Sequence, residues 1–334
     1  MNGRLFAILL LMLAFLSSCE KKEKALVLPP PGSASHAGVE MGADYDKQVF
    51  FDLETNAVVY TSSPASWDLS FESGPNGKHV FVNGGNKTFV FNTHKTDIRS
   101  VTTLPGNLVG SGAGWQFDAS CGLPDSTAIG NWFYENGNTK GELYVVQTGS
   151  GTLYKTRMLA SDNSGYSIEW LPLADTSATT NKVQIGKDSI YNFTYFSFKG
   201  GIVKPEPPKN TWDIVFTRYV YVYRNYPTPG KDFPYDVTGV LLNPYNTSAS
   251  ADSSLAFSNI NLQVAESLPA NNYRDVIGFD WKVYNFNTSR YEVNRSKNYI
   301  IHTRKNQIYK LRFLEFYNNA GVKGNPAFEF ERLK

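Results

Sequence analysis

The chain has 334 residues, with 32 Lys and Arg against 30 Asp and Glu and a formal net charge of +2. Proteins that bind nucleic acid or acidic membranes normally carry a basic excess or a basic stripe, and neither is visible in this sequence. We therefore expect no nucleic-acid partner.

The N-terminus has the features of a bacterial lipoprotein signal. One basic residue, Arg4, precedes an apolar run over 5–16 that is too short to span a bilayer. Two serines then lead to Cys19 in a pattern that resembles a lipoprotein box. We predict that residues 1–18 are a lipoprotein signal peptide and that acyl chains on Cys19 make the only membrane contact. An ordinary signal peptide followed by an incidental cysteine is the alternative.

Residues 19–38 mix charged residues with three consecutive prolines and small side chains. Such a composition buries too little apolar surface to fold, so we predict a lipidated flexible tether. The charged run over 20–23 also resembles, in part, the export tags of surface lipoproteins in some Gram-negative bacteria. The expected location is the outer membrane, with the body of the protein at the cell surface.

The rest of the chain contains one long sequence pattern twice. Three segments of the first half match segments of the second half in the same order: 39–44 with 183–188, 66–71 with 211–216, and 144–159 with 299–314. This order and spacing indicate a duplication whose copies are each long enough to form a domain. The predicted copies are 39–173 and 183–334.

Short aromatic runs with alternating polarity, separated by Gly, Asn, Pro and Asp, are typical of β-strands. The predicted strands, in chain order, are 47–53, 78–84, 87–93, 142–148, 152–158, 166–173, 191–198, 219–224, 237–242, 298–303, 307–313 and 327–333. No stretch of ten residues after the signal peptide has a convincing helical period. The predicted fold class is therefore all-β, with two tandem related antiparallel β domains.

Matched positions in the two copies should share an environment. Met41 aligns with Ile185 and Met158 with Phe313, so both methionines are predicted to fill the core rather than to bind metal. Each copy also has a Trp-Asp pair, at 67–68 and 212–213. The aspartates of these pairs are predicted to accept hydrogen bonds from backbone amides of the adjoining turn, in a structural and not a catalytic role.

Lysine and arginine also recur together in both copies. Lys155 and Arg157 match Lys310 and Arg312, and the two-residue spacing puts both charges of a copy on one strand face. We interpret this as a solvated face that is partly balanced by two glutamates, Glu169 and Glu329. An anion site is the alternative.

Four motifs in the second copy resemble the HmuY family: YFSF at 195–198, WDIVF at 212–216, DWKVY at 280–284 and the closing block at 309–333. The first copy carries degenerate versions of these motifs. The resemblance implies a surface lipoprotein that binds haem and passes it to an outer-membrane uptake receptor for iron acquisition. It also implies that two axial His or Met side chains, from loops at one end of an all-β fold, hold the iron.

Candidate iron ligands are scarce in this sequence. The stretch between Met158 and His302 contains no His or Met, and a lone strand histidine such as His302 is more often structural. The candidate haem ligands are therefore His79 and His94, which both lie at predicted borders between loop and strand. Tyrosine is another conceivable ligand.

The run over 219–236 is rich in tyrosine and could line a flat ligand pocket through Tyr221, Tyr223 and Tyr226. It could equally form a core and a hairpin.

Catalytic function is not indicated, because the chain has no HExxH, GxSxG, phosphate-loop or CxxC motif. We expect a non-enzymatic protein that carries haem or a related porphyrin. The alternative is a surface interaction protein that binds a glycan or a protein through the same β scaffold and has lost haem binding.

Overall fold

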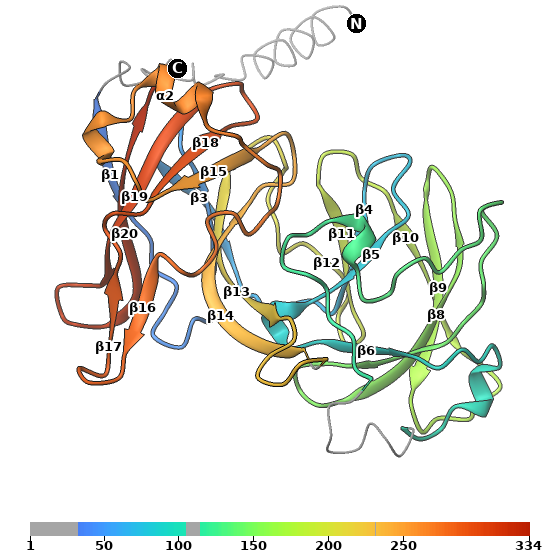
Figure 1. Ribbon diagram of the computed structural model, residues 1–334. Helices are drawn as coiled ribbons and strands as arrows, with labels where there is room; N and C mark the ends of the chain where they lie inside the picture. Colours follow the sequence, from blue (N-terminus) through green and yellow to red (C-terminus); the bar gives the residue numbers. More distant parts are fainter. Residues whose placement is uncertain (1–32, 105–113, 231) are drawn as a thin grey trace, which may run out of the picture.

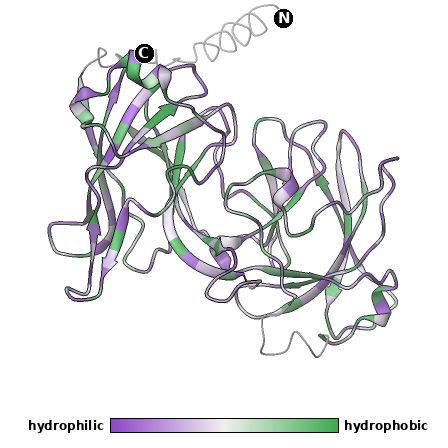
Figure 2. Cartoon of the chain, viewed as in Figure 1, coloured by the Kyte–Doolittle hydropathy of each residue, from purple (hydrophilic) through white to green (hydrophobic). Residues whose placement is uncertain are grey.

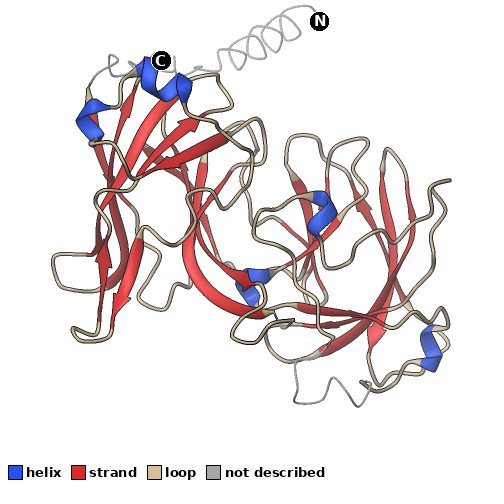
Figure 3. Ribbon diagram, viewed as in Figure 1, coloured by secondary structure: helices blue, strands red, loops and turns tan. Residues whose placement is uncertain are grey.

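The computed structural model describes residues 33–104, 114–230 and 232–334. Strands dominate its regular structure, which confirms the predicted all-β class (Figure 3). The strand segments alternate β-branched and aromatic residues with polar ones, a pattern that suits a pleated sheet with one buried face. The predicted signal peptide and Cys19 lie outside the described residues.

The first β-sandwich combines a five-stranded and a four-stranded antiparallel sheet. The larger sheet has the order β10 (Asn181–Gly186), β9 (Gly165–Pro172), β8 (Leu153–Ser161), β7 (Tyr144–Gln147) and β6 (Phe89–Asn92). The smaller has the order β12 (Gly201–Val203), β11 (Phe193–Ser197), β4 (Leu69–Glu72) and β5 (Val80–Val82). Side chains from both sheets meet in one core, in which Met158 is 1% exposed.

The second β-sandwich has the same two-layer design (Figure 1). One sheet has the order β1 (Ala34–Gly38), β20 (Lys323–Arg332), β19 (Ile308–Tyr317), β18 (Asn298–His302) and β15 (Ser248–Asp252). The other has the order β14 (Phe233–Leu242), β13 (Ile214–Tyr223), β2 (Gln48–Asp52) and β3 (Ala57–Ser62). A separate hairpin consists of β16 (Lys282–Asn285) and β17 (Arg290–Val293), and a short helix, α2 (Leu262–Ser267), packs beside β19.

Figure 2 shows hydrophobic residues concentrated on the strands of both sandwiches. In the second core, Met41 is 1% exposed and packs with Phe51 and Phe313. Both methionines are therefore core residues, as the alignment of the two copies predicts. No helix within the described ranges is long and apolar enough to cross a membrane.

Each sandwich is built from strands of both predicted copies. β2 pairs with β13, with Phe51 opposite Ile214, and β11 pairs with β4, with Phe196 opposite Leu69. The sheets thus divide the chain into 63–205 on one side and 33–62 with 206–334 on the other. Each copy contributes its first strands to the sheets of the other copy, because equivalent strands present equivalent hydrophobic faces.

The folded body also begins earlier than the composition suggests. Ala34–Gly38 form β1 and pair with β20, with His36 opposite Glu329. These five residues lie within the predicted tether, but backbone pairing with an edge strand holds them to the second sandwich.

The Trp-Asp motifs fix this exchange of strands. An Asp213 carboxylate oxygen accepts a hydrogen bond from the amide of Leu53 at 3.0 Å, and Asp68 accepts one from Phe198 at 2.9 Å. Both amides lie just after the strand that came from the other copy. The two aspartates therefore have a structural role, as predicted, but the amides that they bind lie 160 and 130 residues away in sequence and not in the adjoining turn.

The prediction of a solvated basic face is wrong for the two lysines. Lys155 and Lys310 are 0% and 4% exposed. The Nζ of Lys155 donates to the carbonyl oxygens of Val101 and Asp175, and that of Lys310 to those of Phe257 and Ile260. The arginines do pair with Glu169 and Glu329, as predicted. Carbonyl groups of irregular loops need buried donors, and lysine supplies them from a neighbouring strand.

Candidate functional site

A cavity of about 1060 Å³ lies against β13, β14 and the β16–β17 hairpin. The first sandwich contributes to its wall through η1 (Gly84–Asn86), which packs on β13. Aromatic side chains make up ten of its 26 lining residues. The aromatic residues are Tyr45, Tyr219, Tyr221, Tyr223, Tyr235, Tyr273, Phe279, Tyr284, Phe286 and Tyr291.

The period of a β-strand explains one wall of this cavity. Tyr219, Tyr221 and Tyr223 alternate along β13 and therefore share a face. Tyr221 lies opposite Tyr235 on β14, and its ring centroid is 5.0 Å from that of Tyr223. Tyr221 and Tyr223 meet edge to face, and the ring centroids of Tyr223 and Tyr235 lie 6.0 Å apart, so these three rings form an aromatic surface.

Much of this aromatic surface is exposed to solvent. The exposed fractions are 36% for Tyr223, 48% for Tyr235, 39% for Tyr284 and 86% for Phe286. A contiguous exposed apolar patch usually marks a binding surface, because water is excluded from it when a ligand is bound. The two hairpins thus frame an open, flat-walled site.

A buried lysine lies in this cavity. Lys282 is 6% exposed, and its Nζ donates a hydrogen bond to the carbonyl oxygen of Thr238 on β14. The same Nζ lies 4.6 Å from the ring centroid of Trp281 and 4.9 Å from that of Phe316. Burial lowers the pKa of Lys282 from 10.5 to about 7, against the opposing effect of the Asp280 carboxylate.

Three acidic groups that line the cavity already have partners. Asp236 pairs with Lys87 at 2.6 Å, and Asp280 pairs with Lys297. Asp275 accepts a hydrogen bond from Ser120 of the first sandwich. The two ion pairs offset the charges of Asp236 and Asp280, and the hydrogen bond from Ser120 leaves the charge of Asp275 in place.

Two of the three tyrosines expected to line a ligand pocket, Tyr221 and Tyr223, line this cavity. Tyr226 is 56% exposed and lies beside Tyr223, with ring centroids 5.7 Å apart, but it does not line the cavity. The sequence reading missed Lys282 and the β16–β17 hairpin. The DWKVY motif was the available signal, since it places a lysine between apolar residues.

The two candidate histidines lie in the first sandwich, away from the cavity lining. His79 Nδ1 is 2.8 Å from a carboxylate oxygen of Glu72, and His94 Nδ1 is 2.9 Å from one of Glu142. Neither a hydrogen bond nor a ring contact joins the two histidines. Within the described ranges, no group of three or more His, Cys, Asp and Glu residues could hold a metal ion.

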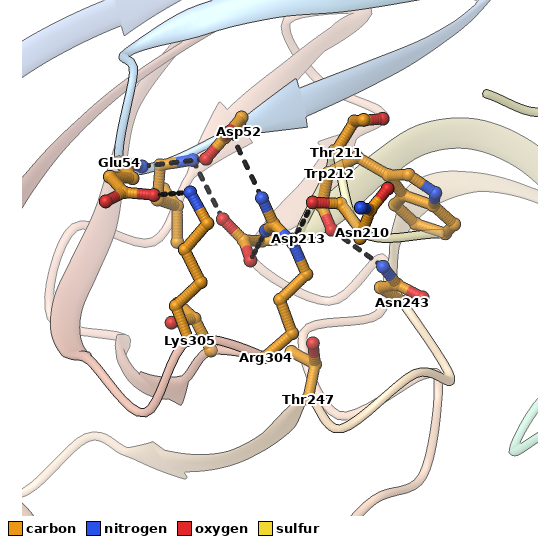
Figure 4. A network of polar contacts seen from close by, with 12 residues as sticks. Asp52, Glu54, Asn210, Thr211, Trp212, Asp213, Asn243, Thr247, Arg304 and Lys305 are labelled. Carbon is orange, nitrogen blue, oxygen red and sulfur yellow. Dashed lines mark hydrogen bonds and ion pairs between the residues drawn. The ribbon is translucent and has the colours of Figure 1, made fainter. Parts of the chain in front are cut away.

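A second polar cluster is structural and lies at the junction of the two copies (Figure 4). Arg304 is 3% exposed at its side chain and pairs with both Asp213 and Asp52. Its Nε also donates to the carbonyl oxygen of Asn210 at 2.7 Å. Burial raises the pKa of Asp213 to about 6, although Arg304 opposes this shift. The cluster locks the segment after β2 onto the Trp-Asp motif of the second copy.

Several solved structures are similar to most of the chain at low identity. Apo PinO from Porphyromonas gingivitis is 11% identical, covering 90% of this chain and 98% of that one, with a TM-score of 0.34. A putative HmuY-like heme-binding protein from Bacteroides vulgatus is 9% identical, covering 92% and 97%, with a TM-score of 0.24. The apo HmuY analog of Tannerella forsythia is 10% identical, covering 92% and 100%, also with a TM-score of 0.24. No curated protein matches the chain.

The family model of the HmuY protein matches the chain over two segments, 44–141 and 189–330. The two segments account for more than half of the chain and follow the tandem copies seen in the sequence. The chain therefore belongs to the HmuY family.

Proposed function

We propose that this chain is a non-enzymatic surface lipoprotein that binds haem or a related porphyrin for iron acquisition. The observation that carries the proposal is the aromatic cavity of about 1060 Å³, which lies largely within the second matched segment. A porphyrin is a flat aromatic ligand, and stacking on tyrosine rings together with burial of apolar surface would favour its binding. An outer-membrane uptake receptor is the proposed partner that accepts the ligand.

A hemin titration of residues 20–334 tests this function. We expect the Soret band to shift at micromolar protein and Tyr223→Ala to weaken binding about tenfold, because a ring of the wall is lost. Tyr134→Ala is a matched control, since Tyr134 is also 56% exposed but does not line the cavity. A Soret band that stays that of free hemin would reject the proposal.

The same titration separates two hypotheses about the iron ligands. If His79 and His94 coordinate the iron, His79→Ala and His94→Ala should each alter the spectrum. If the ligand lies in the aromatic cavity, both variants should leave the spectrum unchanged. Glu72 and Glu142 contact Nδ1 of the two histidines, which leaves Nε2 of each ring as the nitrogen that would bind iron.

Membrane attachment is proposed to depend on Cys19. Palmitate labelling of the full chain should be lost in Cys19→Ala, and labelling that survives the substitution would contradict the anchor.

A surface interaction protein remains the second candidate function. Its supporting observation is that the described residues lining the cavity include no His, Met or Cys. Exposed aromatic rings such as Phe286 and Tyr235 also suit stacking on sugar rings. Binding to a glycan array without any change in the hemin spectrum would favour this candidate.

A further inference from the structure

Lys282 differs from the other buried lysines in what its amino group contacts. Lys155 donates to two carbonyl oxygens, and Lys310 donates to two and also lies 3.1 Å from a carboxylate oxygen of Glu331. Lys282 donates to a single carbonyl oxygen, that of Thr238. No carboxylate of the described residues lies within ion-pair distance of its Nζ. An ammonium group has three protons to donate, and buried charges are normally paired. Only one of the three ammonium protons of Lys282 therefore has an oxygen acceptor among the described residues, and Nζ otherwise lies 4.6–5.4 Å from the ring centroids of Trp281, Phe316 and Tyr291.

A second buried donor lines the same cavity. Tyr219 is 6% exposed, and its hydroxyl has no hydrogen-bond partner among the described residues. Buried hydroxyl groups are nearly always hydrogen-bonded in folded proteins. Tyr219 and Lys282 are both hydrogen-bond donors, so the partner that each of them lacks is an oxygen that accepts a hydrogen bond.

We propose that Lys282, together with Tyr219, binds a carboxylate group carried by the planar aromatic ligand of this cavity. The inference rests on the proposed function and specifies the chemistry of the ligand: an aromatic plate with at least one acidic substituent. The plate would lie against the tyrosine wall of β13 and β14, and the carboxylate would point to the Lys282 amino group.

The charges around the cavity are compatible with an anion at this position. Asp280 is the acidic group that acts on Lys282 most directly, but Lys297 neutralises it. Lys87 neutralises Asp236, whereas Asp275 has only a hydrogen bond from the Ser120 hydroxyl and keeps its charge. The charged residues of the lining that have no ion-pair partner among the described residues are two carboxylates, Asp44 and Asp275, and two cations, Arg218 and Lys282.

The pH dependence of binding distinguishes this role from coordination of iron by the amine. A carboxylate binds the protonated form of the Lys282 amino group. The pKa of Lys282 in the ligand-free protein is about 7, so above pH 7 the protein must take up a proton when it binds the ligand. Affinity for an acidic porphyrin should then fall as pH rises from 7 to 9. Coordination of iron requires the neutral amine and would make affinity rise over the same interval.

The tyrosines that face the cavity do not contribute to this pH dependence. Burial raises the pKa values of Tyr219, Tyr223 and Tyr291, so their hydroxyls stay protonated between pH 7 and pH 9.

The test compares hemin with hemin dimethyl ester, in which both carboxylates are esterified, on residues 20–334 at pH 7 and pH 9. We expect the ester to bind wild type at least about tenfold more weakly at pH 7, and Lys282→Met to bind both forms equally. Lys87→Met is the matched control, because Lys87 lines the cavity but already pairs with Asp236. The Lys87→Met variant should still bind hemin more tightly than hemin dimethyl ester.

The outcomes separate the inference from the function on which it rests. Equal binding of acid and ester to wild type, or an affinity that rises with pH, would overturn the role of Lys282 and leave porphyrin binding in place. Absence of binding by either form would reject the function and the inference together. Thermal unfolding of the free variants checks that they fold, and Lys282→Arg, which keeps the charge, should retain the preference if Lys282→Met is unfolded.

Discussion

At the scale of single residues, the buried carboxyl group of Glu206 links the stability of the protein to pH. Glu206 is 4% exposed and accepts hydrogen bonds from the hydroxyl of Tyr195 at 2.7 Å and the amide of Asn192 at 2.8 Å. Burial raises its pKa from 4.5 to about 7, although both hydrogen bonds favour the charged form. Between these two values the folded protein keeps a proton that the unfolded chain has released. The contribution of Glu206 to stability is therefore present at low pH and is lost as pH rises through 7.

We expect Glu206→Gln to reduce the fall in melting temperature between pH 5 and pH 8, because glutamine does not titrate. Its single amide oxygen can replace only one of the two acceptor oxygens, Oε1 and Oε2, and this loss is the same at both pH values. The effect on the free energy of unfolding should be at most about 3 kcal/mol over this interval. Thermal unfolding of wild type and variant at both pH values measures it. A fall of equal size in the two proteins would show that other groups cause the pH dependence.

At the scale of the elements, the Trp-Asp motif works differently in the two copies. Asp213 accepts from the amide of Leu53 and is also paired with Arg304, whereas Asp68 accepts from the amide of Phe198 and has no ion-pair partner within the described ranges. Removal of Arg304 would leave two buried carboxylates, those of Asp213 and Asp52, without their cation. Breaking a buried pair in this way is strongly destabilising.

Arg304→Met should therefore lower the free energy of unfolding by about 3–5 kcal/mol. Asp68→Asn, in the copy without an arginine, should cost no more than about 1–2 kcal/mol, because it keeps an acceptor for the strand amide. Urea unfolding of the two variants gives both numbers. Similar losses would mean that the arginine adds nothing to the motif.

The sequence allowed some of these elements to be predicted and hid others. The aromatic strands around Tyr221 and Phe313 follow a clear alternation, so the sheets and one wall of the cavity could be anticipated. The β16–β17 hairpin was missed although it contains part of the DWKVY motif, because Val283 and Tyr284 are both exposed and burial does not alternate along β16. Arg304 lies in a turn far from Asp213 in sequence, and no local pattern predicts their contact. The burial of Lys155 could not be predicted, because the spacing of charged residues on a strand does not show which loop carbonyl groups lie over that strand.

At the scale of the whole molecule, duplication and folding follow different boundaries. The sequence repeat divides the chain between 173 and 183, but the sheets of the first sandwich extend from 63 to 205. A fragment cut at the repeat boundary, 183–334, would lack β2 and leave β13 with an unpaired edge. It would also retain β11 without its partner β4. The loss of β2 and the loss of β4 would each expose an apolar strand that is buried in the full chain.

We expect the fragment 63–205 to fold cooperatively on its own, because it contains every strand of both sheets of the first sandwich. The fragment 183–334 should aggregate or remain unfolded, and a chain that joins 33–62 through a flexible linker to 206–334 should restore the second sandwich. Circular dichroism with thermal unfolding, together with size-exclusion chromatography, distinguishes these states. Cooperative unfolding of 183–334 alone would show that each copy can pair its own strands, so that the exchange seen in the full chain would not be required for folding.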